Sequence, residues 1–494
     1  MNSKIRKILA GVFFALITLL FLDFTGTIHT WFGWMAKIQF LPAVLALNVI
    51  VVIALVLLTL LMGRIYCSVI CPLGVLQDIF GWFGKKAKKN RYTYSKPLSV
   101  LRYVMLGVLV VALVAGFTSV AALIAPYSAF GRIASNLFAP VYLWGNNLLA
   151  AVAERADSYA FYHVDVWLKG GITFVVALVT LIALFVLAFK NGRTYCNTIC
   201  PVGTVLGFLS RYSFLKPMID TSKCNGCGLC AKNCKASCID PKNHAIDYSR
   251  CVVCLDCIDK CRKGAIKYVP RKKAAQEAAP SGATADKGRR AFITSTAILA
   301  GASVAQAQKV KMDGGFATIE DKKIPKRETP ITPPGSLSAK NLAQHCTACQ
   351  LCISACPNQV LRPSGGLMNF MQPETSYERG YCRPECTKCS EVCPTGAIKP
   401  ITKEEKTAIQ IGHAVWIADN CIVNRDGQKC GNCERHCPTG AIQMVPKDVN
   451  DPKSLKIPVV NTERCIGCGA CENLCPSRPF SAIYVEGHEV HREI

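Results

Sequence analysis

Cysteines arranged in runs of four are the feature that most limits what this chain can fold into. The 29 cysteines fall into groups of 4, 9 and 16 along the chain. Four runs have the spacing C-x2-C-x2-C-x3-C, and two others, beginning at Cys382 and Cys421, have longer first gaps. Thiolates at this spacing bind [4Fe–4S] clusters. Disulfide scaffolds usually occur in short secreted chains, and zinc ribbons use cysteine pairs. The runs therefore predict iron–sulfur modules.

The spacing rule of two-cluster ferredoxins assigns the ligands. Three cysteines of one run bind one cluster, and the fourth binds the neighbouring cluster. The first soluble module would hold two clusters, on Cys224, Cys227, Cys230 and Cys261, and on Cys251, Cys254, Cys257 and Cys234. The second would hold four, on Cys346, Cys349, Cys352 and Cys393; on Cys382, Cys386, Cys389 and Cys356; on Cys421, Cys430, Cys433 and Cys475; and on Cys465, Cys468, Cys471 and Cys437. Cys238 is left over as an alternative to Cys234, so six [4Fe–4S] clusters are predicted with that choice open.

The first 216 residues are predicted to form an α-helical membrane domain of two repeated helix hairpins. Four apolar stretches, at about 8–24, 40–62, 100–124 and 171–189, are long enough to cross a bilayer. Basic residues flank these stretches, so the net charge of +25 indicates a membrane face rather than nucleic-acid binding. Their distribution places both ends of the four-span unit in the cytoplasm, in a bacterial inner membrane.

One stretch of twelve residues occurs twice, as GRIYCSVICPLG at 63–74 and GRTYCNTICPVG at 192–203, with eight matching positions. A proline suits the first turn of a helix. Each stretch is therefore predicted to end a span and begin a short cytoplasmic helix. This geometry would bring four candidate catalytic cysteines, Cys67, Cys71, Cys196 and Cys200, into one symmetric site. They would bind a metal or a seventh cluster, or act as redox thiols, and these alternatives stay open.

Each charged residue singled out in or just after the repeats has two possible roles. Arg64 and Arg193 are candidate cofactor-binding residues that would lower the pKa of the nearby thiols, or else anchors at the membrane interface. Asp78 could accept a proton from a quinol, but we interpret it as a solvated carboxylate near a helix start.

The remaining sequence divides into two ferredoxin-like α+β modules and connecting segments. The predicted divisions are a membrane domain at 1–216, a two-cluster cytoplasmic module at 217–269, linkers at 270–290 and 309–339, and a four-cluster tandem module at 340–494. Residues 287–308, KGRRAFITSTAILAGASVAQAQ, have the layout of a twin-arginine export signal, with a fifth span at about 291–307. An export signal would place the second module in the periplasm. If the segment is an ordinary linker helix, all six clusters would lie in the cytoplasm.

Several cofactor motifs are missing. The sequence contains no C-x-x-C-H motif for covalent haem, no histidine within the apolar stretches, and no Rossmann or Walker fingerprint for a nicotinamide, flavin or ATP. The chain is therefore expected to exchange electrons with a lipid-soluble quinone.

The order of these features resembles two known families joined end to end. Four spans with two C-x3-C-P stretches and a two-cluster ferredoxin resemble NapH, a membrane quinol-dehydrogenase subunit of periplasmic nitrate reduction. A twin-arginine signal followed by four clusters resembles NapG. The resemblance implies that this quinol dehydrogenase component takes electrons from the membrane quinone pool. The electrons would then pass to a periplasmic reductase or cytochrome in anaerobic respiration.

Two other functions are consistent with the same residues. A cytoplasmic reduced ferredoxin could feed the quinone pool through the first module, which reverses the flow of electrons. The C-x3-C-P cysteines could instead handle thiols or metal during assembly of respiratory complexes, although this role would not need a second, four-cluster module.

Overall fold

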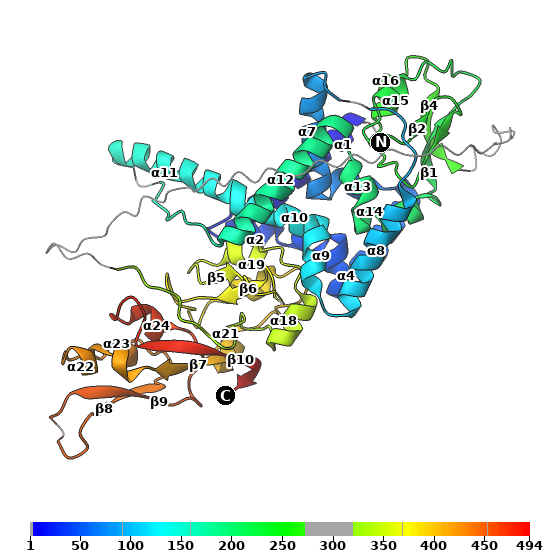
Figure 1. Ribbon diagram of the computed structural model, residues 1–494. Coiled ribbons are helices and arrows are strands. Elements are labelled where there is room, and N and C mark those ends of the chain that lie inside the picture. Colours follow the sequence, from blue (N-terminus) through cyan, green and yellow to red (C-terminus); the bar gives the residue numbers. More distant parts are fainter. Residues whose placement is uncertain (1–2, 91, 159, 272–319, 368, 452) are drawn as a thin grey trace, which may run out of the picture.

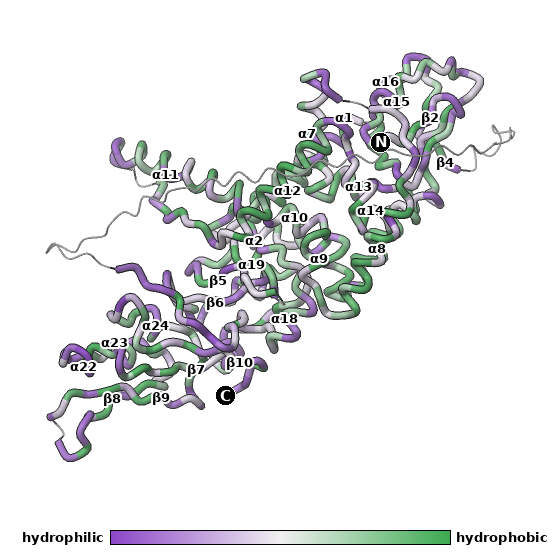
Figure 2. The backbone as a smooth tube through the Cα atoms, in the orientation of Figure 1, coloured by the Kyte–Doolittle hydropathy of each residue, from purple (hydrophilic) through white to green (hydrophobic). Residues whose placement is uncertain are grey.

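The helical part of the molecule lies between the two cysteine-rich modules (Figure 1). This computed structural model describes residues 3–494 except 91, 159, 272–319, 368 and 452. The chain begins beside the first module, and the second module lies at the opposite end of the helices. Figure 2 shows the most hydrophobic backbone in the helices between the modules. The predicted export signal at 287–308 lies outside the described residues.

The helical domain begins with one long helix, which is followed by a mixture of short and long helices. The first elements are α1 (Ser3–Leu22), α2 (Thr27–Phe32), α3 (Trp34–Lys37), α4 (Phe40–Leu45), α5 (Val49–Met62), α6 (Ile65–Val69) and α7 (Pro72–Lys86). They are followed by α8 (Ser99–Val114), α9 (Thr118–Ile124), α10 (Pro126–Ile133), the π-helix η1 (Ala134–Phe138), α11 (Ala139–Arg155), α12 (Gly171–Asn191), α13 (Thr194–Thr198) and α14 (Pro201–Ser210).

The structure does not confirm the prediction of four spans in two hairpins. Within the described residues, α1 and α12 are long and apolar enough to cross a bilayer by length and composition. The stretch at 40–62 is divided into α4 and α5, because Leu47 has φ 52° and the Asn48 side chain caps α5 by accepting from Val51 N at 3.3 Å. The stretch at 100–124 is divided into α8 and α9 at Gly116, whose φ is 79°.

Helix α1 connects the two ends of the helical domain. Its basic end is held by Arg6, which donates to the Ser68 carbonyl at 3.2 Å. Further along, Phe14 and Phe21 pack edge-on against Phe130 of α10, with ring centroids 5.5 and 6.1 Å apart. Its last turns contact α19 of the second module. One helix therefore packs against groups from both ends of the molecule.

The first module has the expected α+β content. Strands β1 (Leu215–Ile219) and β4 (Ile266–Pro270) pair antiparallel, as do β2 (Ile239–Asp240) and β3 (Ala245–Ile246), and the short helices are α15 (Leu229–Lys232) and α16 (Asp256–Lys260). These helices and their loops carry the cysteine runs.

The second module repeats this plan with more elements. Its helices are α18 (Ala339–His345), α19 (Leu351–Ala355), α20 (Lys388–Val392), α21 (Lys403–Ala408), η2 (Ala418–Asn420), α22 (Ile422–Arg425), α23 (Asn432–Arg435) and α24 (Ala470–Leu474). Three antiparallel pairs join β5 (Leu361–Pro363) to β6 (Pro373–Thr375), β7 (Ile409–Trp416) to β10 (Ile483–Glu493), and β8 (Ile442–Pro446) to β9 (Lys456–Val460).

Polar contacts attach the second module to the helical domain. Asn136 of η1 donates to Gln350 Oε1 at 2.7 Å. Beside it, the hydroxyls of Ser135 and Ser354 lie 2.8 Å apart. Because Gln350 is the N-cap of α19 and Ser354 lies within that helix, these bonds place the run beginning at Cys346 directly against the helices.

Candidate metal centres

Each repeated stretch begins with a glycine that the first module requires. Gly63 and Gly192 have φ of 73° and 70°, a region that side chains rarely adopt. A Cβ atom at Gly63 would meet Val253, and one at Gly192 would meet the Lys235 carbonyl. Both glycines therefore let the first module approach the helical domain closely.

The second half of each repeat starts a helix, as the sequence predicted. Cys71 is the N-cap of α7 and Cys200 is the N-cap of α14, each followed by a proline at the first helical position. The amide of Gly203 donates to Cys200 Sγ at 3.3 Å. An amide that points at sulfur favours a thiolate or a metal-bound sulfur at this position.

The two repeats hold each other through their arginines, which we call the crossed arginine pair. Arg64 of the first repeat donates from Nη2 to the Cys196 carbonyl of the second at 3.1 Å. In return, Arg193 donates from Nη1 to the Cys67 carbonyl of the first. Both side chains are completely buried. The pair therefore locks the two cysteine loops together by reciprocal bonds.

Other acceptors complete the environment of the crossed arginine pair. Arg64 Nη1 also donates to Asn197 Oδ1 at 2.9 Å and to the Ser249 carbonyl at 3.0 Å, which ties it to the first module. Arg193 Nε donates to Asp78 Oδ1 at 2.7 Å. The main partners of both arginines are thus oxygen atoms of the protein.

The four repeat cysteines are buried and lie near one another. Burial raises the pKa of the Cys196 thiol, and the two arginines only partly offset this rise. The pKa of Cys200 is raised by burial and then by Cys196, Cys71 and Cys67. At Cys196 and Cys200, desolvation therefore outweighs the nearby positive charge, and the pKa of each thiol lies above its ordinary value.

A buried amide also contacts this cysteine group. Gln77 donates from Nε2 to Cys196 Sγ at 3.2 Å and to the Leu73 carbonyl at the same distance. Gln77 could not be selected from the sequence, because it lies outside the repeated stretch. Its position one turn into α7 is what aims it at the partner repeat.

Asp78 is not the solvated carboxylate that we expected. Arg193 lies 2.7 Å from it, Lys235 3.0 Å and Arg6 3.7 Å. Burial would raise the pKa of Asp78, but Arg193 and Lys235 outweigh burial and hold that pKa well below its usual value. Asp78 therefore joins α1, the second repeat and the first module.

In the first module, one predicted thiol set surrounds an apolar cavity. Its sulfur-bearing lining is Cys234, Cys238, Cys251, Cys254 and Cys257. Cys234 Sγ and Cys238 Sγ are 3.5 Å apart. The hydrogen bond between the two thiols lowers the pKa of Cys234, and either sulfur can be its donor. Of the other set, Cys230 lies near Cys224 and Cys227, and Cys261 is the C-cap of α16.

In the second module, one cavity is lined by four cysteines from two different runs. They are Cys421, Cys430, Cys433 and Cys475, the set that the spacing rule predicted.

The cysteines of the other three predicted sets lie close enough to raise one another's pKa. Burial raises the pKa of Cys352, and Cys346, Cys349 and Cys393 raise it further. Cys389 is similarly surrounded by Cys382, Cys356 and Cys386, and Cys468 by Cys465 and Cys437.

The four cysteine sets of the second module lie next to one another in a fixed order. Cys352 of the first set lies near Cys389 of the second. The amide of Cys382 in that second set donates to the Cys468 carbonyl at 2.9 Å. Cys471 in turn lies near Cys433, which belongs to the set around Cys421. The four sets therefore form a row that starts at the helical domain, where Gly131 packs on the Cys349 carbonyl.

The donor chemistry of these sets fits [4Fe–4S] clusters. In the described part of the chain, no group of three or more His, Cys, Asp or Glu residues is arranged to hold a single metal ion. A cubane cluster binds each thiolate through a different iron, so its ligands stand around a cavity. Amides also point at the sulfurs, since Ala441 N and Ala482 N donate to Cys437 and Cys475 at 3.3 Å.

Comparison with known proteins agrees with this chemistry. The family model described as "4Fe-4S binding domain" matches residues 44–91 and 173–218, and the "4Fe-4S dicluster domain" matches 428–478. The chain is 30% identical to the ferredoxin-type protein NapF of Escherichia coli K12, over 36% of this chain and 100% of NapF. It is 30% identical to the methylamine utilization ferredoxin-type protein MauM of Methylobacillus flagellatus, over 33% and 70%.

Coverage of the other relatives is partial. The chain is 26% identical to the ferredoxin-type protein NapH of Escherichia coli K12, over 47% of this chain and 70% of NapH. Three further curated relatives are matched over only 35%, 66% and 55% of their own lengths. No solved structure matches the chain.

The crossed arginine pair generates a stability prediction. Arg193→Gln leaves Asp78 without its nearest cation and leaves the Cys67 carbonyl without its donor. Removing one partner of a buried ion pair costs about 3–5 kcal/mol. We expect a lower midpoint of thermal unfolding in detergent, whereas the matched exposed variant Arg155→Gln should unfold like the wild type. Equal midpoints for Arg193→Gln and the wild type would show that the crossed arginine pair does not stabilise the fold.

The two neighbouring thiols in the first module can be told apart by substitution. Cys234→Ser should lose about four iron atoms per chain, because a cubane ligand is removed. Cys238→Ala should keep its iron but lower the reduction potential of one cluster, because a donor to sulfur is lost. Iron analysis and redox titration followed by EPR measure both effects. Iron loss in Cys238→Ala alone would make Cys238 the ligand.

Proposed function

This chain belongs to the ferredoxin-type 4Fe–4S electron-transfer proteins, and from that premise we propose that it oxidises a membrane quinol and passes the electrons to a periplasmic reductase. The two ferredoxin modules would be joined through the helical domain into one electron path. The nitrate-reductase type of acceptor is favoured by the similarity to NapF and NapH.

The placement of the two modules carries this proposal. They lie at opposite ends of the apolar helices (Figure 2), while α1 contacts groups at both ends. Two modules that served the same compartment would have no need to be separated by membrane-type helices. A path that collects electrons on one side and releases them on the other needs this arrangement.

The thiol sets supply the steps of the path. Bound [4Fe–4S] clusters would accept and release single electrons, so the two electrons of a quinol would leave one at a time. The chain's own residues hold the sets in contact, as in the bond from Cys382 N to the Cys468 carbonyl. Amides such as Ala441 N stabilise the charge that builds up on sulfur. The set around Cys421, at the far end of the row, would deliver electrons to the partner.

The repeat cysteines would connect the first module to the second. Cys67, Cys71, Cys196 and Cys200 lie between the first module, which contacts Arg64 through Ser249, and the helices that carry the second. The description of the matching family model supports a seventh cluster on these thiols over free redox thiols. Tyr195 of the second repeat extends from this group to the Ile124 carbonyl at 2.8 Å, toward the second module.

The basic residues support a cytoplasmic first module and a periplasmic second module as part of this proposal. Lys85, Lys86, Lys88 and Lys89 lie at and just after the end of α7, on the side of the first module. Positive charge marks the cytoplasmic face, so the first module would be cytoplasmic and the second periplasmic. The twin-arginine-like segment at 287–308 would carry the chain back across the membrane, as an internal export signal and fifth span.

Quinol oxidation predicts a specific spectroscopic result. The purified full chain, reconstituted in lipid nanodiscs without oxygen, should develop EPR signals of reduced [4Fe–4S] clusters when decylubiquinol or menadiol is added. The same protein reduced with dithionite gives the total signal for comparison. If dithionite reduces the clusters and neither quinol does so at any quinol-to-quinone ratio, the proposed function is wrong.

A further inference from the structure

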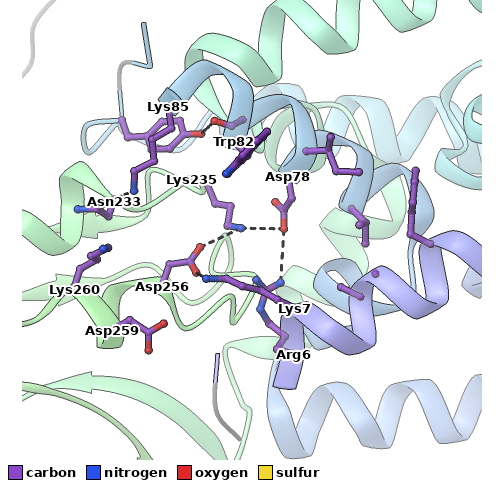
Figure 3. Close-up of a pocket in the computed structure, with 17 residues that line it drawn as sticks. Arg6, Lys7, Asp78, Trp82, Lys85, Asn233, Lys235, Asp256, Asp259 and Lys260 are labelled. Atoms are coloured by element: carbon purple, nitrogen blue, oxygen red, sulfur yellow. Dashed lines mark hydrogen bonds and ion pairs between the residues drawn. The ribbon is translucent and has the colours of Figure 1, made fainter. Parts of the chain in front are cut away.

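One large cavity lies where α1, α7 and the first module meet (Figure 3). Its volume is about 470 Å³. Neither the cysteine sets nor the crossed arginine pair accounts for this space. Two of its walls are helices of the helical domain, and the third is formed by α16 and the segment after α15 in the first module.

The helical walls of the cavity are apolar. Ala10, Gly11 and Phe14 line it from α1, and Ile79 and Trp82 line it from α7. A Cβ atom at Gly11 would meet nothing within 4 Å, so this glycine leaves open space at the wall. An apolar tail or ring could therefore enter from the side of the helices without displacing protein atoms.

The opposite end of the cavity is strongly polar. Asp78 and Asp256 are bridged by Lys235, whose Nζ lies 3.0 and 3.1 Å from their carboxylates. Lys7 lies 3.2 Å from Asp256, and Arg6 lies 3.7 Å from Asp78. These groups converge on one side of the cavity in Figure 3. They offer both hydrogen-bond acceptors and cationic donors to one bound group.

The polar end is built from residues adjacent to predicted cluster ligands. Lys235 follows Cys234, and Asp256 precedes Cys257. These two cysteines line the apolar cavity of the first module together with Cys251 and Cys254. A molecule seated in the large cavity would therefore lie beside one thiol set, separated from it by the backbone that carries these residues.

We propose that this cavity binds the head group of the quinol, with the ring against Phe14 and Trp82 and the oxygens toward Asp78 and Lys235. The assignment rests on the proposed function and specifies where the substrate sits. A quinol has an apolar tail and a ring with two oxygens, which act as hydroxyl donors in the quinol and as carbonyl acceptors in the quinone. Asp78 accepts from the reduced form, and Lys235 donates to the oxidised form. A cavity with one apolar and one mixed-charge end matches both states.

The test is to fill the cavity without touching its charges. Gly11→Leu places a side chain in the open space of α1. Gly107→Leu is the matched control, because Gly107 lies on the exposed surface of α8, also has nothing within 4 Å of its Cβ position, and does not line the cavity. A second pair, Trp82→Ala and Trp144→Ala, removes one exposed tryptophan at the cavity and one on α11.

We expect Gly11→Leu and Trp82→Ala to raise the decylubiquinol concentration for half-maximal cluster reduction by about tenfold. They should weaken quenching of the fluorescent quinol analogue 2-heptyl-4-hydroxyquinoline N-oxide by a similar factor. Their reduction by dithionite should match the wild type, which shows that the clusters are intact. Both control variants should retain wild-type values in all three measurements.

Three results would overturn the assignment. If the wild type is reduced by quinol and both cavity variants behave like their controls, quinol binds elsewhere while the proposed function stands. If Gly11→Leu loses only copurified anionic phospholipid, with quinol kinetics unchanged, the cavity holds a lipid head group. If the wild type is not reduced by quinol at all, the proposed function fails and the quinol site fails with it.

Discussion

The burial of two arginines between the repeated stretches is the constraint on which the rest of the molecule depends. A guanidinium removed from water must find acceptors, because an unpaired buried charge costs far more free energy than one hydrogen bond returns. Arg64 finds them in the partner repeat and in Ser249 of the first module, and Arg193 finds them in the partner repeat and Asp78. The helices, the cysteine loops and the first module are thereby fixed together as one unit.

This constraint also explains the composition of the repeats. Glycines at 63 and 192 allow the first module to approach, while Gly74 and Gly203 leave room for the arginine that arrives from the other repeat. The two cysteines of each stretch sit between these glycines, and the following proline begins the next helix. Duplication thus produces two half-sites, each of which is completed by the other's arginine.

Much of the cysteine chemistry could be predicted from spacing alone, because ligand spacing is set by local loop geometry. The rule that exchanges fourth ligands joined Cys475 to the run at Cys421, and the structure surrounds one cavity with that set. The exposure of Asp78 could not be predicted, because it depends on contacts between residues that are distant in sequence. Asp78 looked solvated because its partners Arg193 and Lys235 lie 115 and 157 residues away. Likewise, hydropathy does not register the interruptions at Leu47 and Gly116, which arise from backbone conformation within apolar sequence.

The most direct test of one electron path between the two ends is oxidation from one side of a sealed membrane. Right-side-out vesicles that contain the full chain are first reduced with a permeant reductant and then exposed to ferricyanide, which does not cross the membrane. A continuous path predicts that the EPR signals of all the clusters disappear together, including those of the first module. Loss of the second module's signals alone, with the first module still reduced, would contradict a connection through the helical domain.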